Sequence, residues 1–221
     1  MANKILHIYK RLYETYGAQG WWPFMDGGYH PGEYDYPKNE AQIFEICLGV
    51  ILTQNTTFTS VVKSLQNIKD MDCLDHESIQ NISLEDLKKA LRPSGYFNQK
   101  AAYILGFIDF FKNLNGRTPS RKELLAVKGI GEESADSILL YAYNRPEFVV
   151  DAYTKRLLSH LGLINERAKY EEIKMLMQNK IAEEIKEEKD IVAFYQEYHA
   201  LIVAHAKRHY SKKPYGEGCF L

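Results

Sequence analysis

Apolar residues recur three and four positions apart along most of the chain, which places them on one face of a helix. The segments predicted as helices on this ground are 5–16, 39–52, 58–68, 83–92, 97–111, 120–125, 135–142, 152–161, 170–177 and 191–205. A loop rich in Gly, Pro and Tyr separates the first two helices, and a stretch of this length is typical of a functional segment or a linker. Neither a strand pattern nor a tandem repeat emerges. The sequence therefore predicts an all-α fold.

The rest of the chain is organised around residues 127–151. Gly129 and Gly131 flank a single apolar residue, Ile130, at the point where one helix ends and the next begins. Phe148–Val150 then form a short extended apolar run that leads to Asp151. The predicted unit is a helix, a tight glycine hairpin, a second helix, an extended link and a carboxylate.

Each part of this unit has a chemical use and a plainer alternative. Free backbone N–H groups at a hairpin and a helix N-terminus bind anions such as phosphate, but Gly129–Gly131 can also be an ordinary interhelical turn. Asp151 can simply cap the helix that follows it. Both roles can hold together, because a helix N-terminus keeps a carboxylate ionised, which suits a group that faces a cationic transition state.

Composition sets limits on partners and on location. The 221 residues carry a net charge of -1, so any nucleic-acid binding must come from local patches rather than from a global basic field. Three widely spaced cysteines fit a reducing compartment without a disulfide framework. No signal-peptide pattern and no long uncharged apolar run is present, so we expect a soluble intracellular protein.

The unit at residues 127–151 resembles the helix-hairpin-helix motif of the endonuclease III-like DNA glycosylase superfamily. That family has an apolar residue, x, Gly, apolar, Gly, two residues, Ser or Thr, and Ala, followed about twenty residues later by an extended Val-Asp. Leu52–Thr56 and Gly95–Ala101 resemble two further family segments, Leu-x-Gln-x-Thr and Gly-x-Tyr-x-x-Lys-Ala. The resemblance covers most of the chain from Trp21 to about Cys219 and is greatest to the bacterial 3-methyladenine DNA glycosylase branch.

The resemblance implies two helical lobes with the active-site cleft between them. We expect a six-helix barrel-type domain with the hairpin at 39–146, and a discontinuous helical domain from 1–38 plus 147–221. Asp151 is then the catalytic carboxylate, and Gln54 is inserted into the duplex to fill the gap left by the extruded base. The expected base-pocket residues are Trp22, Pro23, Phe58 and Lys207. The remaining expected DNA contacts are Lys128, Gly129, Ile130, Gly131, Ser134 and Lys212.

Residue chemistry gives independent reasons for some of these roles. An indole face attracts a methylated, positively charged purine by stacking and by cation–π interaction, which favours Trp22 as a pocket residue. Large rings more often pack in the core, and this alternative holds for Trp22 and Phe58. Lys212 lies in a basic segment without acidic residues that is either an ordinary basic tail or a phosphate contact.

Two departures from the family pattern bear on the chemistry. Members that also cut the DNA backbone carry a lysine four residues after the first hairpin glycine, where this chain has Glu133. Many members hold a [4Fe–4S] cluster with four cysteines near the C-terminus, where only Cys219 is present, and one thiolate cannot hold such a cluster. We therefore expect a monofunctional glycosylase without iron and without another metal, with a monovalent cation at the hairpin left open.

The function predicted is base excision repair: the protein flips an alkylated, 3-methyladenine-like purine from double-stranded DNA and hydrolyses its N-glycosidic bond. We expect a monomer with no membrane contact in the cytoplasm, associated with the nucleoid in a prokaryote. One alternative is a glycosylase for another lesion, such as an oxidised pyrimidine or a mismatched thymine. The other is a DNA-binding protein that keeps the hairpin but has lost the chemistry.

Overall fold

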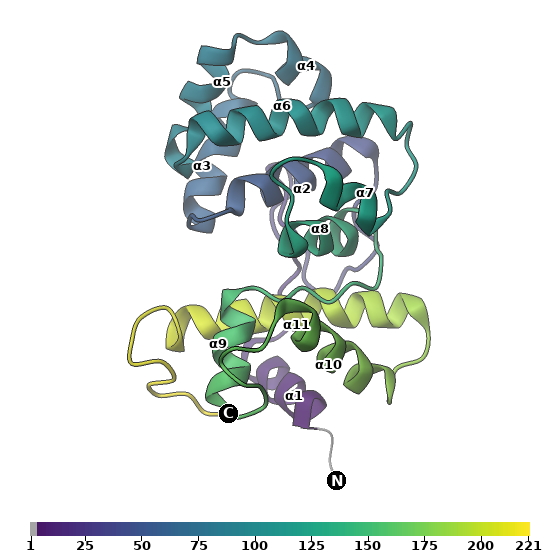
Figure 1. Ribbon diagram of the computed structural model, residues 1–221, viewed down its shortest axis with the longest axis vertical. Helices are drawn as coiled ribbons and strands as arrows, with labels where there is room; N and C mark the ends of the chain where they lie inside the picture. The colour runs from purple at the N-terminus through teal and green to yellow at the C-terminus, as the bar shows by residue number, and fades with distance from the viewer. Residues whose placement is uncertain (1–3) are drawn as a thin grey trace. The chain divides into compact units, whose positions relative to one another are not determined.

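The computed structural model describes residues 4–221, and these residues form an all-helical fold without β-strands, apart from one isolated bridge between Phe24 and Gly28 (Figure 1). The α-helices are α1 Lys4–Tyr16, α2 Glu40–Thr53, α3 Phe58–Lys69, α4 His76–Asn81, α5 Leu84–Leu91, α6 Phe97–Asn113, α7 Arg121–Ala126, α8 Glu132–Ser137, α9 Ala152–His160, α10 Tyr170–Ala182 and α11 Glu188–His209. Two short segments complete the set, a 3-10 helix η1 at Arg92–Ser94 and a π-helix η2 at Ile138–Ala142. The predicted all-α class is confirmed.

The chain divides into two compact units. We call the first the terminal unit, because it joins the chain up to Trp22 with Tyr29–Tyr34 and Asn144–Leu221. The second, the central unit, consists of Pro23–Gly28 and Asp35–Tyr143.

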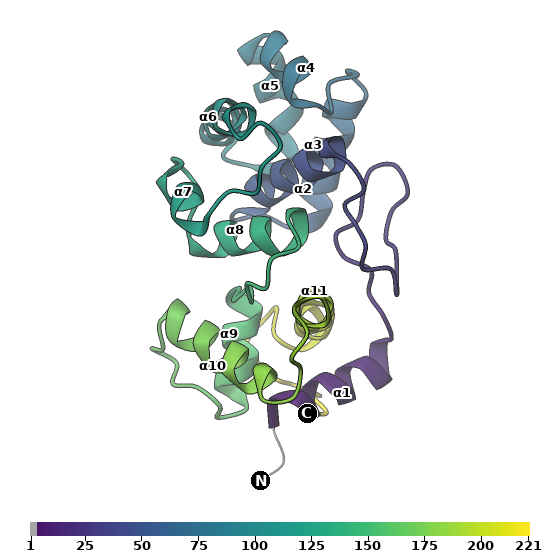
Figure 2. The same ribbon diagram turned by 90° about the vertical axis from the view of Figure 1, so that its right-hand side faces the viewer.

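The terminal unit is built around α11, whose middle is buried almost all round because α1 and α9 pack against it (Figures 1 and 2). Tyr9 of α1 stacks on Phe194 with ring centres 4.0 Å apart, and the buried Tyr198 hydroxyl donates a hydrogen bond to the Ile5 carbonyl at 2.8 Å. Burying aromatic rings of this size dominates the energetics of such a core. The first helix of the chain therefore depends on the last.

The central unit has α2 as its most apolar helix, buried from Phe44 to Leu52 between η2, α3 and α6. Asn39 caps α2 by accepting a hydrogen bond from the Gln42 backbone, and Ser120 with Glu123 forms a capping box at the start of α7. Both helix starts were predicted from the sequence, and both are confirmed. Side-chain oxygens at these positions satisfy backbone donors that have no partner inside the helix.

Candidate active site and DNA-contact residues

Asp151 is placed by a buried extended segment and a helix start. Phe148, Val149 and Val150 are buried, which fixes the link that leads to the carboxylate. Asp151 then caps α9, and its Oδ1 accepts hydrogen bonds from the Thr154 backbone N–H at 2.7 Å and from the Thr154 hydroxyl at 2.8 Å. The structure therefore contains the helix cap that the sequence suggested as the alternative role of Asp151. Both cap hydrogen bonds go to Oδ1, and the other carboxylate oxygen, Oδ2, takes no part in them.

His199 of α11 faces this second oxygen, with 3.8 Å between its Nε2 and Asp151 Oδ2. Burial alone would raise the pKa of Asp151, but His199 and the two donors of Thr154 outweigh it, so the pKa lies below its usual value. The carboxylate is consequently ionised at neutral pH although little of it reaches solvent. His199 is a neighbour that sequence reasoning missed, because nothing local in the sequence brings α11 to Asp151.

A cavity of about 420 Å³ lies further along α11. Residues from the loop after α1 and from α11 line it: Ala18, Gln19, Trp21, Tyr29, Val203, Ala204, Lys207 and Arg208. The Lys207 Nζ lies 5.6 Å from the centre of the Trp21 ring, a cation–π contact. Desolvation lowers the pKa of Lys207, and the negative charge of Asp151 opposes that shift. The two charged groups therefore interact electrostatically.

Trp21, rather than its neighbour Trp22, is the tryptophan that lines this cavity. Trp22 is buried to 5% exposure, its carbonyl oxygen lies 3.0 Å from His30 Nε2, and its ring meets the Trp21 ring edge-on. Of the two adjacent tryptophans, Trp22 therefore belongs to the core and Trp21 to the cavity lining. Tyr29, the second aromatic residue of the cavity, carried no sequence signal beyond its place in the Gly- and Tyr-rich loop.

The loop that carries Trp21 is fixed to α11 at two points by one buried carboxylate. Glu197 accepts hydrogen bonds from the Gln19 backbone N–H and from the Tyr34 hydroxyl, both at 2.8 Å. Burial raises the pKa of Glu197, and these two donors oppose the rise. The loop is therefore fixed to α11 at Gln19 and at Tyr34. Two residues between these points, Trp21 and Tyr29, line the cavity.

The hairpin of the central unit runs from the end of α7 to the start of α8. Gly129 has a φ of +93°, and a Cβ there would meet the Tyr103 ring at 2.4 Å, so a side chain is excluded by the protein itself. At Gly131, the N-cap of α8, a Cβ would meet no heavy atom within 4 Å. Lys128 is exposed, whereas the Ile130 side chain is buried. Only the backbone of Ile130 is thus available to a partner.

Gln54 is the C-cap of α2, and its side chain reaches the hairpin within the same unit. Its Nε2 donates to the Gly129 carbonyl at 2.8 Å and to the Ser134 hydroxyl at 3.2 Å. Three residues predicted to contact DNA are therefore joined in one hydrogen-bonded group. Ser134 is only 8% exposed, so its hydroxyl is used within the protein as the acceptor for Gln54.

Three further predicted residues, Pro23, Phe58 and Lys212, are at least partly exposed to solvent. Pro23 and Phe58 are half-buried residues of the central unit, and Phe58 is the first residue of α3. Lys212 is exposed in the turns that follow α11. The structure thus brings Trp21, Lys207 and Asp151 together in one unit, and Gln54, Gly129 and Ser134 together in the other.

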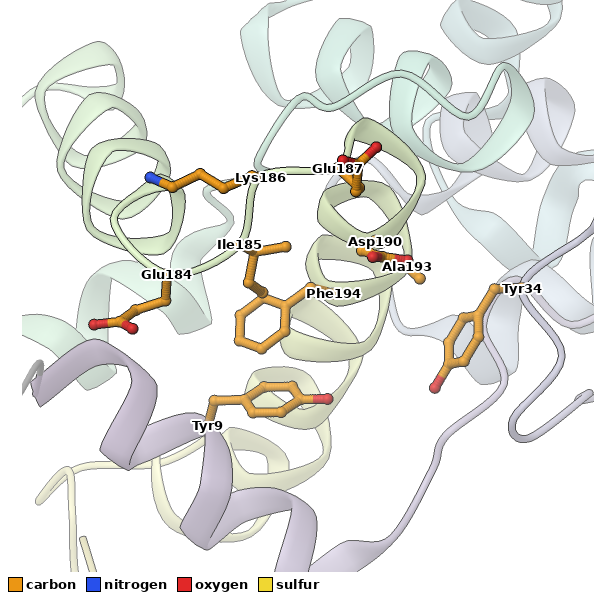
Figure 3. A pocket seen from close by; sticks show the side chains of 9 residues that line it. All are labelled: Tyr9, Tyr34, Glu184, Ile185, Lys186, Glu187, Asp190, Ala193 and Phe194. Carbon is orange, nitrogen blue, oxygen red and sulfur yellow. The ribbon is translucent and has the colours of Figure 1, made fainter.

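A second cavity, of about 700 Å³, also belongs to the terminal unit and has a different character (Figure 3). Its lining includes the rings of Tyr9 and Phe194, and three carboxylates against one ammonium group: those of Glu184, Glu187, Asp190 and Lys186. These carboxylates would repel phosphate. We therefore assign no DNA contact to it.

The cysteines do not fit an iron–sulfur cluster. Cys47 is buried within α2 and Cys73 belongs to the central unit, while Cys219 Sγ lies 3.3 Å from His205 Nε2 and accepts a hydrogen bond from the Tyr210 hydroxyl at 3.2 Å. Among residues 4–221 no group of three or more His, Cys, Asp or Glu could hold a metal ion. Nor does that part of the chain contain a helix long and apolar enough to cross a membrane.

Residues 48–183 match a protein family described as the HhH-GPD superfamily base excision DNA repair protein. The chain belongs to the HhH-GPD superfamily. The predicted kinship with helix-hairpin-helix glycosylases is confirmed, and the chain is a DNA glycosylase of base excision repair whose partner is damaged DNA.

Individual HhH-GPD relatives extend over almost the whole chain. A candidate DNA repair glycosylase of Methanocaldococcus jannaschii is 39% identical over 97% of this chain and 92% of its own length. The crystal structure of an H. pylori 3-methyladenine DNA glycosylase bound to 1,N6-ethenoadenine is 30% identical, with a TM-score of 0.74 over 93% of this chain and 97% of that one. A non-covalent endonuclease III–DNA complex has a TM-score of 0.72 over 96% of this chain and 89% of that one at 18% identity, which establishes the shared fold.

Proposed function

We propose that this DNA glycosylase removes alkylated purines of the 3-methyladenine type and has no lyase activity. The observation that carries the proposal is the cavity in which the Trp21 ring already holds a cation, Lys207, near the ionised Asp151. A ring face that attracts an ammonium group also attracts a methylated purine, because both carry positive charge. The similarity to a 3-methyladenine DNA glycosylase supports the same substrate class.

Asp151 supplies the chemistry in this proposal. As the bond from the sugar C1′ to the base nitrogen breaks, its electron pair leaves with the base, and positive charge develops on the sugar. The ionised carboxylate stabilises that charge and accepts a proton from the water that adds to C1′. An alkylated base is already cationic and leaves as a neutral molecule, so no general acid is required. Extruding the base costs a few kcal/mol, least for damaged bases.

The direct test is to incubate the purified protein with alkylated double-stranded DNA and identify the released base. We expect 3-methyladenine. The same assay is run on duplexes of the same sequence that contain an oxidised pyrimidine or a mismatched thymine. Release of one of these bases, with no release of alkylated purines, would move the chain to another lesion class. No release from any of them, with DNA binding retained, would indicate a non-catalytic binding protein.

The carboxylate of Glu133 at the lyase position predicts that the protein does not cut the DNA backbone, because a carboxylate cannot form the Schiff base that β-elimination requires. Glu133 is exposed at the start of α8. Borohydride treatment during turnover should trap no covalent protein–DNA adduct, and abasic product should break only after alkali is added. A trapped adduct would show that another lysine acts as the nucleophile.

The placement of the three cysteines predicts a colourless protein. The purified enzyme should show no visible absorbance of an iron–sulfur cluster and no iron by elemental analysis, because a cluster needs four thiolates in one place. Cys219→Ser should therefore leave base release unchanged within about twofold, since a hydroxyl can replace the thiol in the contacts with His205 and Tyr210. Stoichiometric iron would contradict this reading.

A further inference from the structure

A buried lysine of the central unit contacts the end of α2 next to Gln54, the residue expected to enter the duplex. Lys100, on α6, is only 2% exposed. Its Nζ donates to the Leu52 carbonyl and to the Ser94 carbonyl, each at 2.8 Å. A buried ammonium group is costly unless it is hydrogen-bonded, and burial lowers the pKa of Lys100 to about 8. The side chain therefore remains mainly protonated at neutral pH.

The first of these carbonyls belongs to the end of α2. Leu52 lies in the last turn of that helix, where carbonyl groups have no partner within the helix and the helix dipole is negative. Two residues later comes Gln54, followed by Asn55 with a φ of +53° in the turn to α3. Lys100 thus holds the last turn of α2 immediately before the Gln54 turn.

The second carbonyl ties the same ammonium to α3 and α5. Ser94 belongs to η1, and its hydroxyl donates to the Leu91 carbonyl at 2.8 Å while its backbone N–H donates to the Ser64 hydroxyl at 3.2 Å. Leu91 ends α5 and Ser64 lies on α3, which is the helix that follows the Gln54 turn. Lys100 therefore joins the helix before the turn to a segment fixed on the helix after it.

We propose that Lys100 is a positioning residue for DNA distortion: its ammonium fixes the α2–α3 turn so that Gln54 is presented for insertion into the duplex. The proposal rests on the assignment of Gln54 as the inserted residue. Lys100 itself is too buried to touch DNA, so its whole effect must pass through the turn. Without the ammonium, two buried carbonyls would lose their donor and the end of α2 would loosen. The backbone at Gln54 would then be mobile, and only the side-chain hydrogen bonds to the hairpin would still position this residue.

The test is a double-mutant cycle between Lys100→Met and Gln54→Ala, because coupling between two residues is measured cleanly only in this way. The probe is a duplex with a tetrahydrofuran abasic analogue next to 2-aminopurine, whose fluorescence reports a side chain entering the gap. We expect Lys100→Met to weaken binding to this duplex about tenfold, and to change it less than about twofold when Gln54 is already alanine. Binding to an undamaged duplex should not change, since phosphate contacts do not depend on the base.

Lys112→Met is the matched control, because Lys112 lies on the same helix but is exposed, and its Nζ donates to the side chain of Gln80. It should leave both duplexes unaffected. Thermal unfolding shows whether each variant folds, and Lys100→Gln, which retains a polar donor, replaces Lys100→Met in the cycle if the latter does not fold. Equal losses in both Gln54 backgrounds, or on both duplexes, would overturn the proposal and make Lys100 a residue of general stability.

The abasic analogue contains no base to release, so this result is independent of the lesion and of Asp151. Failure to release alkylated bases would overturn the proposed substrate and leave the Lys100 result standing. An unchanged fluorescence response in Gln54→Ala alone would instead show that Gln54 does not enter the gap, and the role of Lys100 would fall with it.

Discussion

Replacing Asp151 by asparagine should lower the rate of base release by about a hundredfold or more, because charge stabilisation and general-base catalysis each contribute on that order. The amide oxygen of asparagine can still accept the hydrogen bonds that Thr154 gives to Oδ1, and asparagine is itself a good helix N-cap. The fold should therefore be retained while the negative charge is lost. DNA affinity should be unchanged or higher. The measurement is single-turnover release of 3-methyladenine, alongside a binding titration.

Asp75→Asn provides the matched control. Asp75 also caps a helix, α4, through hydrogen bonds from the Glu77 and Ser78 backbones, but it belongs to the central unit, whereas Asp151 belongs to the terminal unit. The same chemical change there should leave turnover intact. The pKa of Asp151 is lowered from its ordinary value, so the midpoint of any activity loss caused by its protonation should lie at a lower pH than for an ordinary aspartate. Turnover like that of the wild type in Asp151→Asn would exclude the mechanism.

Alanine substitution of the two tryptophans should change two different properties: the rate of base release for Trp21 and the stability of the fold for Trp22. Trp21→Ala removes a ring that lines the cavity, and a stacking or cation–π loss worth about 1–3 kcal/mol should slow release of 3-methyladenine by about fivefold to 150-fold. Affinity for abasic-site DNA should hardly change, because that DNA presents no base. Trp22→Ala empties a core position instead, and should lower the free energy of unfolding by about 3–5 kcal/mol.

Unfolding and base-release measurements on both variants separate these effects. If Trp22→Ala selectively slowed base release and left the melting temperature intact, Trp22 would be the stacking residue, as the sequence predicted. If Trp21→Ala reduced affinity for all DNA alike, the cavity would be a general binding surface. The alkylated-base proposal would then lose its main physical support.

The helices were predictable because most carry a long apolar stripe. The structure adds α4, which was missed because only Ile79 of its six residues is buried and no period can be read from one position. The π-helical turn at Ile138–Ala142 was also not foreseen, since all five residues are buried and an element that is apolar all round shows no face. Where burial is one-sided, periodicity identifies the element, and where it is not, tertiary packing decides.

The candidate site was predictable only where its parts are close in the sequence. The order of hairpin, extended link and carboxylate indicated Asp151, and the adjacent tryptophans indicated an aromatic pocket. The partners of these residues come from α11, and the hydrogen bond that holds the loop there joins Gln19 to Glu197, which are 178 positions apart. Composition and spacing contain no information on such pairs. The position of His199 beside Asp151 and the position of Trp21 in the cavity lining therefore required the structure.

The discontinuous make-up of the terminal unit has a consequence for the order of events during synthesis on the ribosome. The central unit is encoded almost without interruption, so it can fold as soon as Tyr143 has emerged. The first helix, α1, must meanwhile wait with its apolar face uncovered, because it packs against α10 and α11, which are synthesised last. Asp151, Trp21 and Lys207 are brought together in the same late step. A chain whose translation stops before α11 would thus carry a folded central unit but no assembled group of Asp151, Trp21 and Lys207. Its exposed first helix would make it a substrate for chaperones and proteases.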